Sequence, residues 1–226
     1  MAPSTPPAPQ SEAELCERAH ALAGMTLGAL AERLAVPCPP DLRGHKGWIG
    51  NLMERALGAD AGSRDEPDFA ALGIELKTLP VNRHGRPVET TFVCTIPLSH
   101  VHETPWESSR VRRKLAHVLG VPVEGERVIP LAERRIGSAL SWRMDATSEA
   151  KLRADWEELA GLIGRGAVEE ISGRLGRYLQ VRPKARDGSV RKRAIDAEGE
   201  LIETLPRGFY LRTQFTAQIL AGAFGA

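Results

Sequence analysis

The sequence is poor in cysteine, and it has no long apolar run. Its 226 residues contain three cysteines, Cys16, Cys38 and Cys94, which lie too far apart for a CxxC motif or a disulfide framework. We therefore expect reduced thiols in a cytoplasmic protein. No apolar run approaches the roughly 18 residues that a membrane span needs, so we expect no membrane contact. The first residues lack the basic and apolar regions of a secretory signal.

The chain also lacks a charge of one dominant sign. Its 30 basic and 29 acidic residues give a formal net charge of +1, which argues neither for nor against a polyanionic partner. The hydrophobic fraction of 42% is typical of an ordinary globular protein. The length suits one large domain or one domain divided into two lobes.

Helices come first in the expected order of elements, followed by strands and then by a mixture, which favours a mixed α/β (α+β) fold. Residues 1–10, rich in proline and alanine, are expected to form a disordered arm. Capping residues and hydrophobic spacing predict helices over residues 11–23, 26–34, 46–58, 149–164, 168–174 and 216–224. Strands are predicted over residues 72–79, 89–96, 116–123, 177–183 and 207–212.

Three of these expectations concern connections. The turn-forming link "VNRHGRP" predicts that strands 72–79 and 89–96 pair as an antiparallel hairpin. A turn is expected near Arg110. Residues 184–200 are expected to form an exposed loop or a weak helix.

The stretch "DFAALGIELKTLP" places charged residues in an apolar strand. Asp68 precedes the strand, and Glu75 and Lys77 are two residues apart, so both side chains leave by the same face. Two carboxylates and the carbonyl of Leu76 are hard oxygen ligands of the kind that Mg²⁺ prefers. A lysine beside them could orient a water and stabilise charge on a phosphate, as phosphodiester hydrolysis requires. Glu54, off the apolar stripe of the preceding helix, could complete the acidic set.

Two interpretations of this D-x6-E-x-K pattern stay open on spacing alone. The pattern is short, and a strand face with Glu and Lys is commonly a solvated surface with a weak salt bridge. The surrounding apolar residues favour a buried pair, because buried charges persist only when they are paired or bound to a metal.

Basic residues gather in two stretches, which predict either a phosphate-binding surface or a solvated run of charge. The first is "RVRRK", which ends at Lys114, and the second is 174–193, which includes Arg182 and Lys184. His100 and His102 could suggest zinc, but no further ligand cluster accompanies them, and we interpret them as loop residues.

Long blocks of the sequence resemble the MutH family, the strand-nicking endonucleases of methyl-directed DNA mismatch repair. The resemblance extends from about residue 13 to about residue 220. The blocks are "KGWIGNLMERALGADAGS", "DFAALGIELKTLP", "GRPVETTFVC", "VPVEGER", "DWEEL", "YLQVRPKA" and "LPRGFYL".

This resemblance implies a restriction-endonuclease-like fold, with a mixed sheet flanked by helices and two lobes around a DNA cleft. Residues 11–226 would form one endonuclease domain, with a catalytic lobe over about 11–140. A DNA-reading lobe with the C-terminal helix would cover about 141–226. The implied activity is Mg²⁺-dependent nicking of the unmethylated strand at hemimethylated GATC sites.

The family's functional residues match positions of this chain. The catalytic and metal-binding set is implied to be Glu54, Asp68, Glu75 and Lys77, with Leu76 supplying its carbonyl. The residues implied to contact double-stranded DNA are Lys46, Phe92, Lys114, Arg182, Lys184 and Tyr210. From the strand pattern alone, Phe92 and Tyr210 could equally be ordinary packing aromatics.

The resemblance also implies a MutL-type activator protein that contacts the last helix, and a monomer is expected. The ending "AQILAGAFGA" carries less charge than we would expect for that contact. Two alternatives stay open from the sequence: a restriction-type enzyme that cuts both strands, and a DNA-binding module without catalysis.

Overall fold

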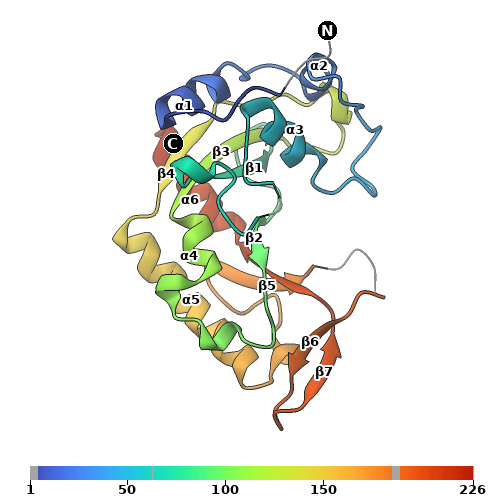
Figure 1. Cartoon of the computed structure of the whole chain (residues 1–226). Helices are drawn as coiled ribbons and strands as arrows, with labels where there is room; N and C mark the ends of the chain where they lie inside the picture. The colour runs from blue at the N-terminus through green and yellow to red at the C-terminus, as the bar shows by residue number, and fades with distance from the viewer. Residues whose placement is uncertain (1–4, 63, 185–188, 226) are drawn as a thin grey trace. The chain divides into compact units, whose positions relative to one another are not determined.

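A computed structural model describes residues 5–62, 64–184 and 189–225 of the chain (Figure 1). The described residues contain six α-helices and eight β-strands, so the predicted mixed α/β class is confirmed. No helix among them is both long enough and apolar enough to cross a membrane. The helices are α1 (Glu12–His20), α2 (Leu27–Arg33), α3 (Trp48–Leu57), α4 (Arg110–Leu115), α5 (Ala146–Gly164) and α6 (Thr213–Phe224). The strands are β1 (Glu75–Val81), β2 (Thr91–Thr95), β3 (His117–Glu124), β4 (Leu140–Arg143), β5 (Leu179–Pro183), β6 (Lys192–Ile195), β7 (Leu201–Thr204) and β8 (Arg207–Leu211).

The chain divides into two compact units, which are described separately below. Unit 1 comprises residues 1–89, 116–143 and 217–226, and unit 2 comprises 90–115 and 144–216. This division differs from the single boundary expected near residue 140. The physical reason is strand pairing: β2 pairs with β8 of unit 2, whereas β3 pairs with β1 of unit 1.

The sheet of unit 1 has the strand order β1-β3-β4. β1 runs parallel to β3, with Glu75 opposite Val118, and β3 is antiparallel to β4. The predicted hairpin between strands 72–79 and 89–96 is therefore wrong. The link between them does turn, because the Asn82 side chain accepts from the backbone of His84 and Arg86. The chain returns only briefly along the end of β1, where Val81 is bridged antiparallel to Pro87, and then enters β2 of unit 2.

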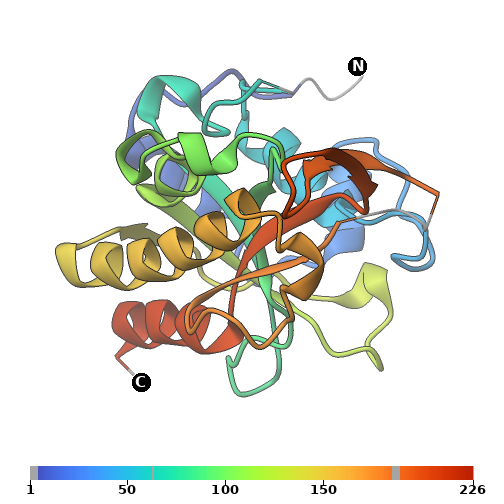
Figure 2. The same cartoon turned by 90° about the horizontal axis from the view of Figure 1, so that it is seen from below.

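Unit 2 contains an antiparallel sheet of order β2-β8-β5 and a separate two-stranded ribbon, β6-β7. The ribbon corrects the expectation of a loop or weak helix over residues 184–200; residues 185–188 lie outside the described part. Helix α5, the longest of the described helices at 19 residues, packs against β5 (Figure 2). Residues 110–115 form α4 where a turn was expected.

The helix ends follow the capping chemistry of the sequence in most places. Ser11 caps α1 by accepting from the Glu14 amide, and Thr26 caps α2 by accepting from the Ala29 amide. Thr216 was expected to cap the last helix, but α6 begins earlier and Thr216 lies inside it. Its buried hydroxyl is hydrogen-bonded to Thr91 instead, at 3.1 Å.

The expected disordered arm is corrected for residues 5–10, because this segment packs on unit 1. The Pro7 carbonyl accepts from Arg18 at 2.7 Å, and Pro9 is buried. Gly58 ends α3 with a φ of 80°, and a Cβ at this position would lie 2.5 Å from the Pro7 carbonyl oxygen. Glycine therefore supplies both the left-handed conformation and the room for this segment.

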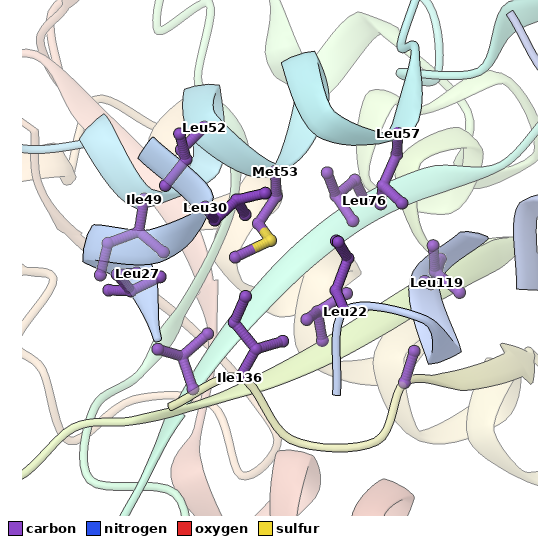
Figure 3. Close-up of a cluster of buried hydrophobic side chains, with 14 of the residues drawn as sticks. Leu22, Leu27, Leu30, Ile49, Leu52, Met53, Leu57, Leu76, Leu119 and Ile136 are labelled. Atoms are coloured by element: carbon purple, nitrogen blue, oxygen red, sulfur yellow. The ribbon is translucent and has the colours of Figure 1, made fainter. Parts of the chain in front are cut away.

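The core of unit 1 forms where α3 lies on β1. Ile49, Leu52, Met53 and Leu57 of the predicted stripe are buried, while Trp48 and Ala56 pack at its edge. Figure 3 shows Leu76 of β1 pointing into this cluster beside Met53 and Leu57. The direction of Leu76 decides the direction of its neighbours, since side chains alternate along a strand.

Candidate active site

Glu75 and Lys77 occupy the face of β1 opposite to Leu76. The Lys77 Nζ lies 2.6 Å from Glu75 Oε1. The Glu75 side chain is only 4% exposed and that of Lys77 is 12% exposed. This pair is therefore buried, and the interpretation of a solvated strand face does not hold.

Asp68 lies beside this pair because the chain folds back before β1. After Asp68 it makes a short 3-10 turn, Ala70–Leu72, and reverses at Gly73, which has a φ of 65°. The reversal lets Asp68 Oδ2 accept from the Leu76 amide at 2.9 Å. The half-buried Asp68 carboxylate is thus fixed next to the residue that separates Glu75 from Lys77.

Glu54 lies on α3, which packs against β1. The Asp60 amide donates to the Asp68 carbonyl at 3.0 Å, which ties the segment after α3 to the segment before β1. The Glu54 side chain is half-buried. Within the described residues, however, no three His, Cys, Asp or Glu side chains gather around one possible metal position. The structure therefore brings Asp68 to the strand that carries Glu75 and Lys77, and the assignment of Glu54 to the same site stays a prediction.

Four of the predicted DNA contacts come together in unit 2, on the sheet β2-β8-β5. We call Phe92, Arg182, Lys184 and Tyr210 the reading group, after the role that the sequence resemblance implies for them. Phe92 is opposite Tyr210 in the register, and their ring centroids lie 5.3 Å apart, edge to face. The Arg182 guanidinium lies 6.0 Å from the Tyr210 ring, and the Lys184 ammonium lies 3.8 Å from the Phe92 ring. Two aromatic faces and two cations are suited to bases and phosphates, respectively.

Tyr210 is a neutral phenol at physiological pH. Burial raises the pKa of its hydroxyl, and the neighbouring Arg182 acts weakly in the opposite direction. The hydroxyl therefore keeps its proton and can donate a hydrogen bond to a base edge.

Gly208 is a residue of this surface that sequence reasoning missed. A Cβ on Gly208 would lie 2.9 Å from the Phe92 ring, 3.1 Å from the Cys94 carbonyl oxygen and 3.3 Å from the Tyr210 ring. Because Gly208 has no side chain, the Phe92 and Tyr210 rings can occupy the space above it. The available signal was the glycine inside the strand "RGFYL", which often marks a close approach.

Asp155 is a second residue that sequence reasoning missed. It is buried on α5 and accepts hydrogen bonds from the amides of Arg177, Tyr178 and Leu179, at 2.9, 2.5 and 2.8 Å. These bonds fix the start of β5, the strand that carries Arg182. Nothing in the sequence distinguished Asp155 from the solvated acids of the same helix.

The two remaining predicted DNA contacts belong to other segments of the chain. Lys46 is exposed in unit 1, directly before Gly47, which begins α3 with a φ of 94°. Lys114 is half-exposed on α4 in unit 2. Neither is part of the reading group.

Comparison with known proteins gives a consistent result. Residues 57–155 match the family model described as "DNA mismatch repair enzyme MutH". A "DNA mismatch repair protein MutH" from Klebsiella pneumoniae (strain 342) is 54% identical over 224 residues, covering 99% of this chain and 96% of the relative. A protein of the same name from Vibrio cholerae is also 54% identical, covering 95% of this chain and 97% of the relative. Another from Serratia proteamaculans is 54% identical, covering 97% of this chain and 96% of the relative. The chain therefore belongs to the MutH family of DNA mismatch repair enzymes.

Proposed function

We propose that this MutH-family chain is a Mg²⁺-dependent DNA endonuclease that nicks the unmethylated strand at hemimethylated GATC sites. The observation that carries the proposal is the buried Glu75–Lys77 pair, with the Asp68 carboxylate bonded to the amide between them. Burying an ion pair costs desolvation free energy even when its two charges compensate each other, so a buried pair at this position favours a chemical role.

The acidic residues fit magnesium through their donor chemistry. Asp68, Glu75 and the Leu76 carbonyl would hold the ion with hard oxygen atoms, and Glu54 would join them from α3. The chemistry that magnesium supplies when bound is a water of lowered pKa and neutralisation of charge on the phosphate. Lys77 would orient the attacking water and stabilise the phosphate, while Glu75 holds the Lys77 ammonium in place.

The reading group would recognise the site from unit 2. A guanidinium such as that of Arg182 can bind guanine O6 and N7 with two hydrogen bonds. Tyr210 would contact the adenine and so sense its methyl group, with Phe92 packed against its ring. Lys184, Lys46 and Lys114 would contact DNA phosphates, which positions the duplex without reading its sequence.

A digest of one plasmid in three methylation states tests the proposal. We expect Mg²⁺-dependent nicked circles from hemimethylated DNA, a cut 5′ to the G of the unmethylated strand, and no cut in fully methylated DNA. Linear product at low enzyme concentration would instead indicate a restriction-type enzyme that cuts both strands. Binding without nicking at any Mg²⁺ concentration would indicate a non-catalytic module.

We further propose a MutL-type activator as partner, acting on a cytoplasmic monomer. A hollow of about 830 Å³ lies beside α6 and is mainly apolar. Its lining includes Leu220, Ala221 and Phe224, and Phe224 is 52% exposed. Phe224→Ser should reduce stimulation by MutL without changing basal nicking, whereas Val128→Ser, an exposed apolar change outside the hollow, should not. If MutL stimulated Phe224→Ser as strongly as Val128→Ser, the proposed MutL contact at this hollow would be contradicted.

A further inference from the structure

Thr90 contacts the reading group although it belongs to none of its strands. It lies directly before β2, and its Oγ1 accepts a hydrogen bond from Arg182 Nη1 at 3.0 Å. β2 and β5 are not neighbours, since β8 lies between them. The bond therefore connects β5 with the residue directly before β2, although β8 separates these two strands.

The strand register shows that Arg182 and Thr90 are offset along the sheet. Arg182 is level with Gly208, whereas Thr91 is level with Leu211, three residues further along β8. The Tyr210 ring lies 6.0 Å from the same guanidinium. The guanidinium therefore has the Thr90 hydroxyl as a hydrogen-bond acceptor and the Tyr210 ring as a neighbour.

We propose that Thr90 is a positioning residue that sets the orientation of the Arg182 guanidinium and thereby the base preference at the first position of the site. This inference rests on the proposed function. A guanidinium has five donor hydrogens, so one bond to Thr90 orients its plane while using only one of them. Threonine is stiff at χ1, which makes its hydroxyl a fixed acceptor. Without it, a long flexible side chain must be ordered each time DNA binds.

Three variants test the role of the hydroxyl. Thr90→Val keeps the shape and removes the acceptor, and Thr90→Ser keeps the acceptor. Thr95→Val is the matched control, because Thr95 lies on β2 and its hydroxyl accepts from Arg110, outside the reading group. KM and kcat for nicking are measured on hemimethylated GATC duplexes and on duplexes with the first guanine replaced by adenine.

Thr90→Val should lower the preference for guanine about tenfold, through KM more than kcat, because a misoriented arginine loses part of a bidentate contact. Thr90→Ser should restore the wild-type preference, and Thr95→Val should keep it. A purely structural role would instead weaken nicking of both duplexes equally, or would not be rescued by serine, and either result would overturn the proposal.

A double-mutant cycle checks that Thr90 acts through Arg182. In an Arg182→Ala background, Thr90→Val should have little further effect on the binding ratio for the two duplexes, measured without metal. An undiminished effect in that background would reject the proposal. Wild-type enzyme without preference for GATC would overturn both the proposed function and this inference, whereas an unchanged ratio for Thr90→Val in a specific wild type would overturn only the role of Thr90.

Discussion

The Glu75 carboxylate and the Lys77 ammonium lie 2.6 Å apart in a largely buried position, so each compensates the charge of the other. Removing one partner leaves an uncompensated buried charge, which costs about 3 kcal/mol or more in proteins. Lys77→Met should therefore lower the free energy of unfolding and reduce nicking about 100-fold or more, since the lysine also serves the proposed chemistry. Denaturant titration and plasmid nicking measure the two effects.

A matched variant separates stability from chemistry at this pair. The double variant Glu75→Gln/Lys77→Met removes both charges and should regain much of the lost stability without regaining activity. DNA binding should largely survive in both variants. Normal nicking by either one would remove Glu75 and Lys77 from the catalytic set.

Gly208 gives a second prediction for a single residue. Gly208→Ala would press a methyl group against the Phe92 ring and the Cys94 carbonyl, a close contact that typically costs about 1–3 kcal/mol. It should also displace Tyr210 and reduce discrimination between hemimethylated and fully methylated plasmids. Gly173→Ala, where a Cβ would meet no atom within 4 Å, is the control. An unchanged melting temperature and methylation preference for Gly208→Ala would contradict the crowding argument.

Among the secondary-structure elements, β5 depends on α5 for the position of its first residues. The Asp155 carboxylate accepts from three successive amides, and Asp155→Ala would leave these amides without their acceptor. Hydrogen bonds to a charged group contribute about 1.5–3 kcal/mol each. Asp155→Ala should therefore lower the free energy of unfolding by about 2 kcal/mol at least and by several kcal/mol at most. Thermal unfolding measures this loss of stability, and Glu158→Ala, an exposed change on the same helix, is the control. Equal destabilisation by the two variants would contradict a role for Asp155.

A second link between elements fastens α1 to β3 and β4 and is sensitive to pH. Ser141 donates its hydroxyl hydrogen to Glu12, so its oxygen accepts from Nε2–H of the buried His117 at 2.9 Å. Arg143 also donates to Glu12, at 2.5 Å. Burial lowers the pKa of His117 against an opposing effect of Glu12, and the hydrogen bond from Ser141 lowers the pKa of Glu12.

The sign of the pH dependence follows from these two shifts. The unfolded chain protonates His117 near its ordinary pKa of 6.5, above the lowered pKa of the folded protein, so stability falls as the pH drops below about 6.5. Glu12 contributes stability that is present above its ordinary pKa of 4.5 and is lost as the pH falls below it. His117→Gln should therefore flatten the fall in unfolding free energy between about pH 7 and 5, as measured by denaturant titration. The same slope in the variant would assign the dependence to other groups.

At the scale of the whole molecule, the formal net charge of +1 does not predict weak DNA binding, because phosphates respond to local charge. If about four phosphates are contacted, raising the salt from about 50 to 200 mM should weaken binding about 100-fold. Lys114→Ala should reduce the salt slope by about one and weaken all sequences alike, unlike a change in the reading group. Salt-independent affinity in a binding titration would argue against a phosphate-contacting surface.

The sequence by itself determined the local structure and the residue types of the candidate site. Ser11 and Thr26 cap their helices, and the stripe of α3 packs as its spacing predicts, because capping and helical periodicity act within a few residues. The strand around Glu75 and Lys77 was likewise visible from its apolar neighbours.

Only the tertiary structure decided which distant segments meet. β1 pairs with β3 and β2 with β8, since the choice among strand partners depends on the core that they bury together and not on the turn between them. The same holds for the space above Gly208, the three amides that Asp155 binds, and the bond from Arg182 to Thr90. These contacts join residues far apart in the chain. A local sequence pattern does not indicate which distant residues will meet.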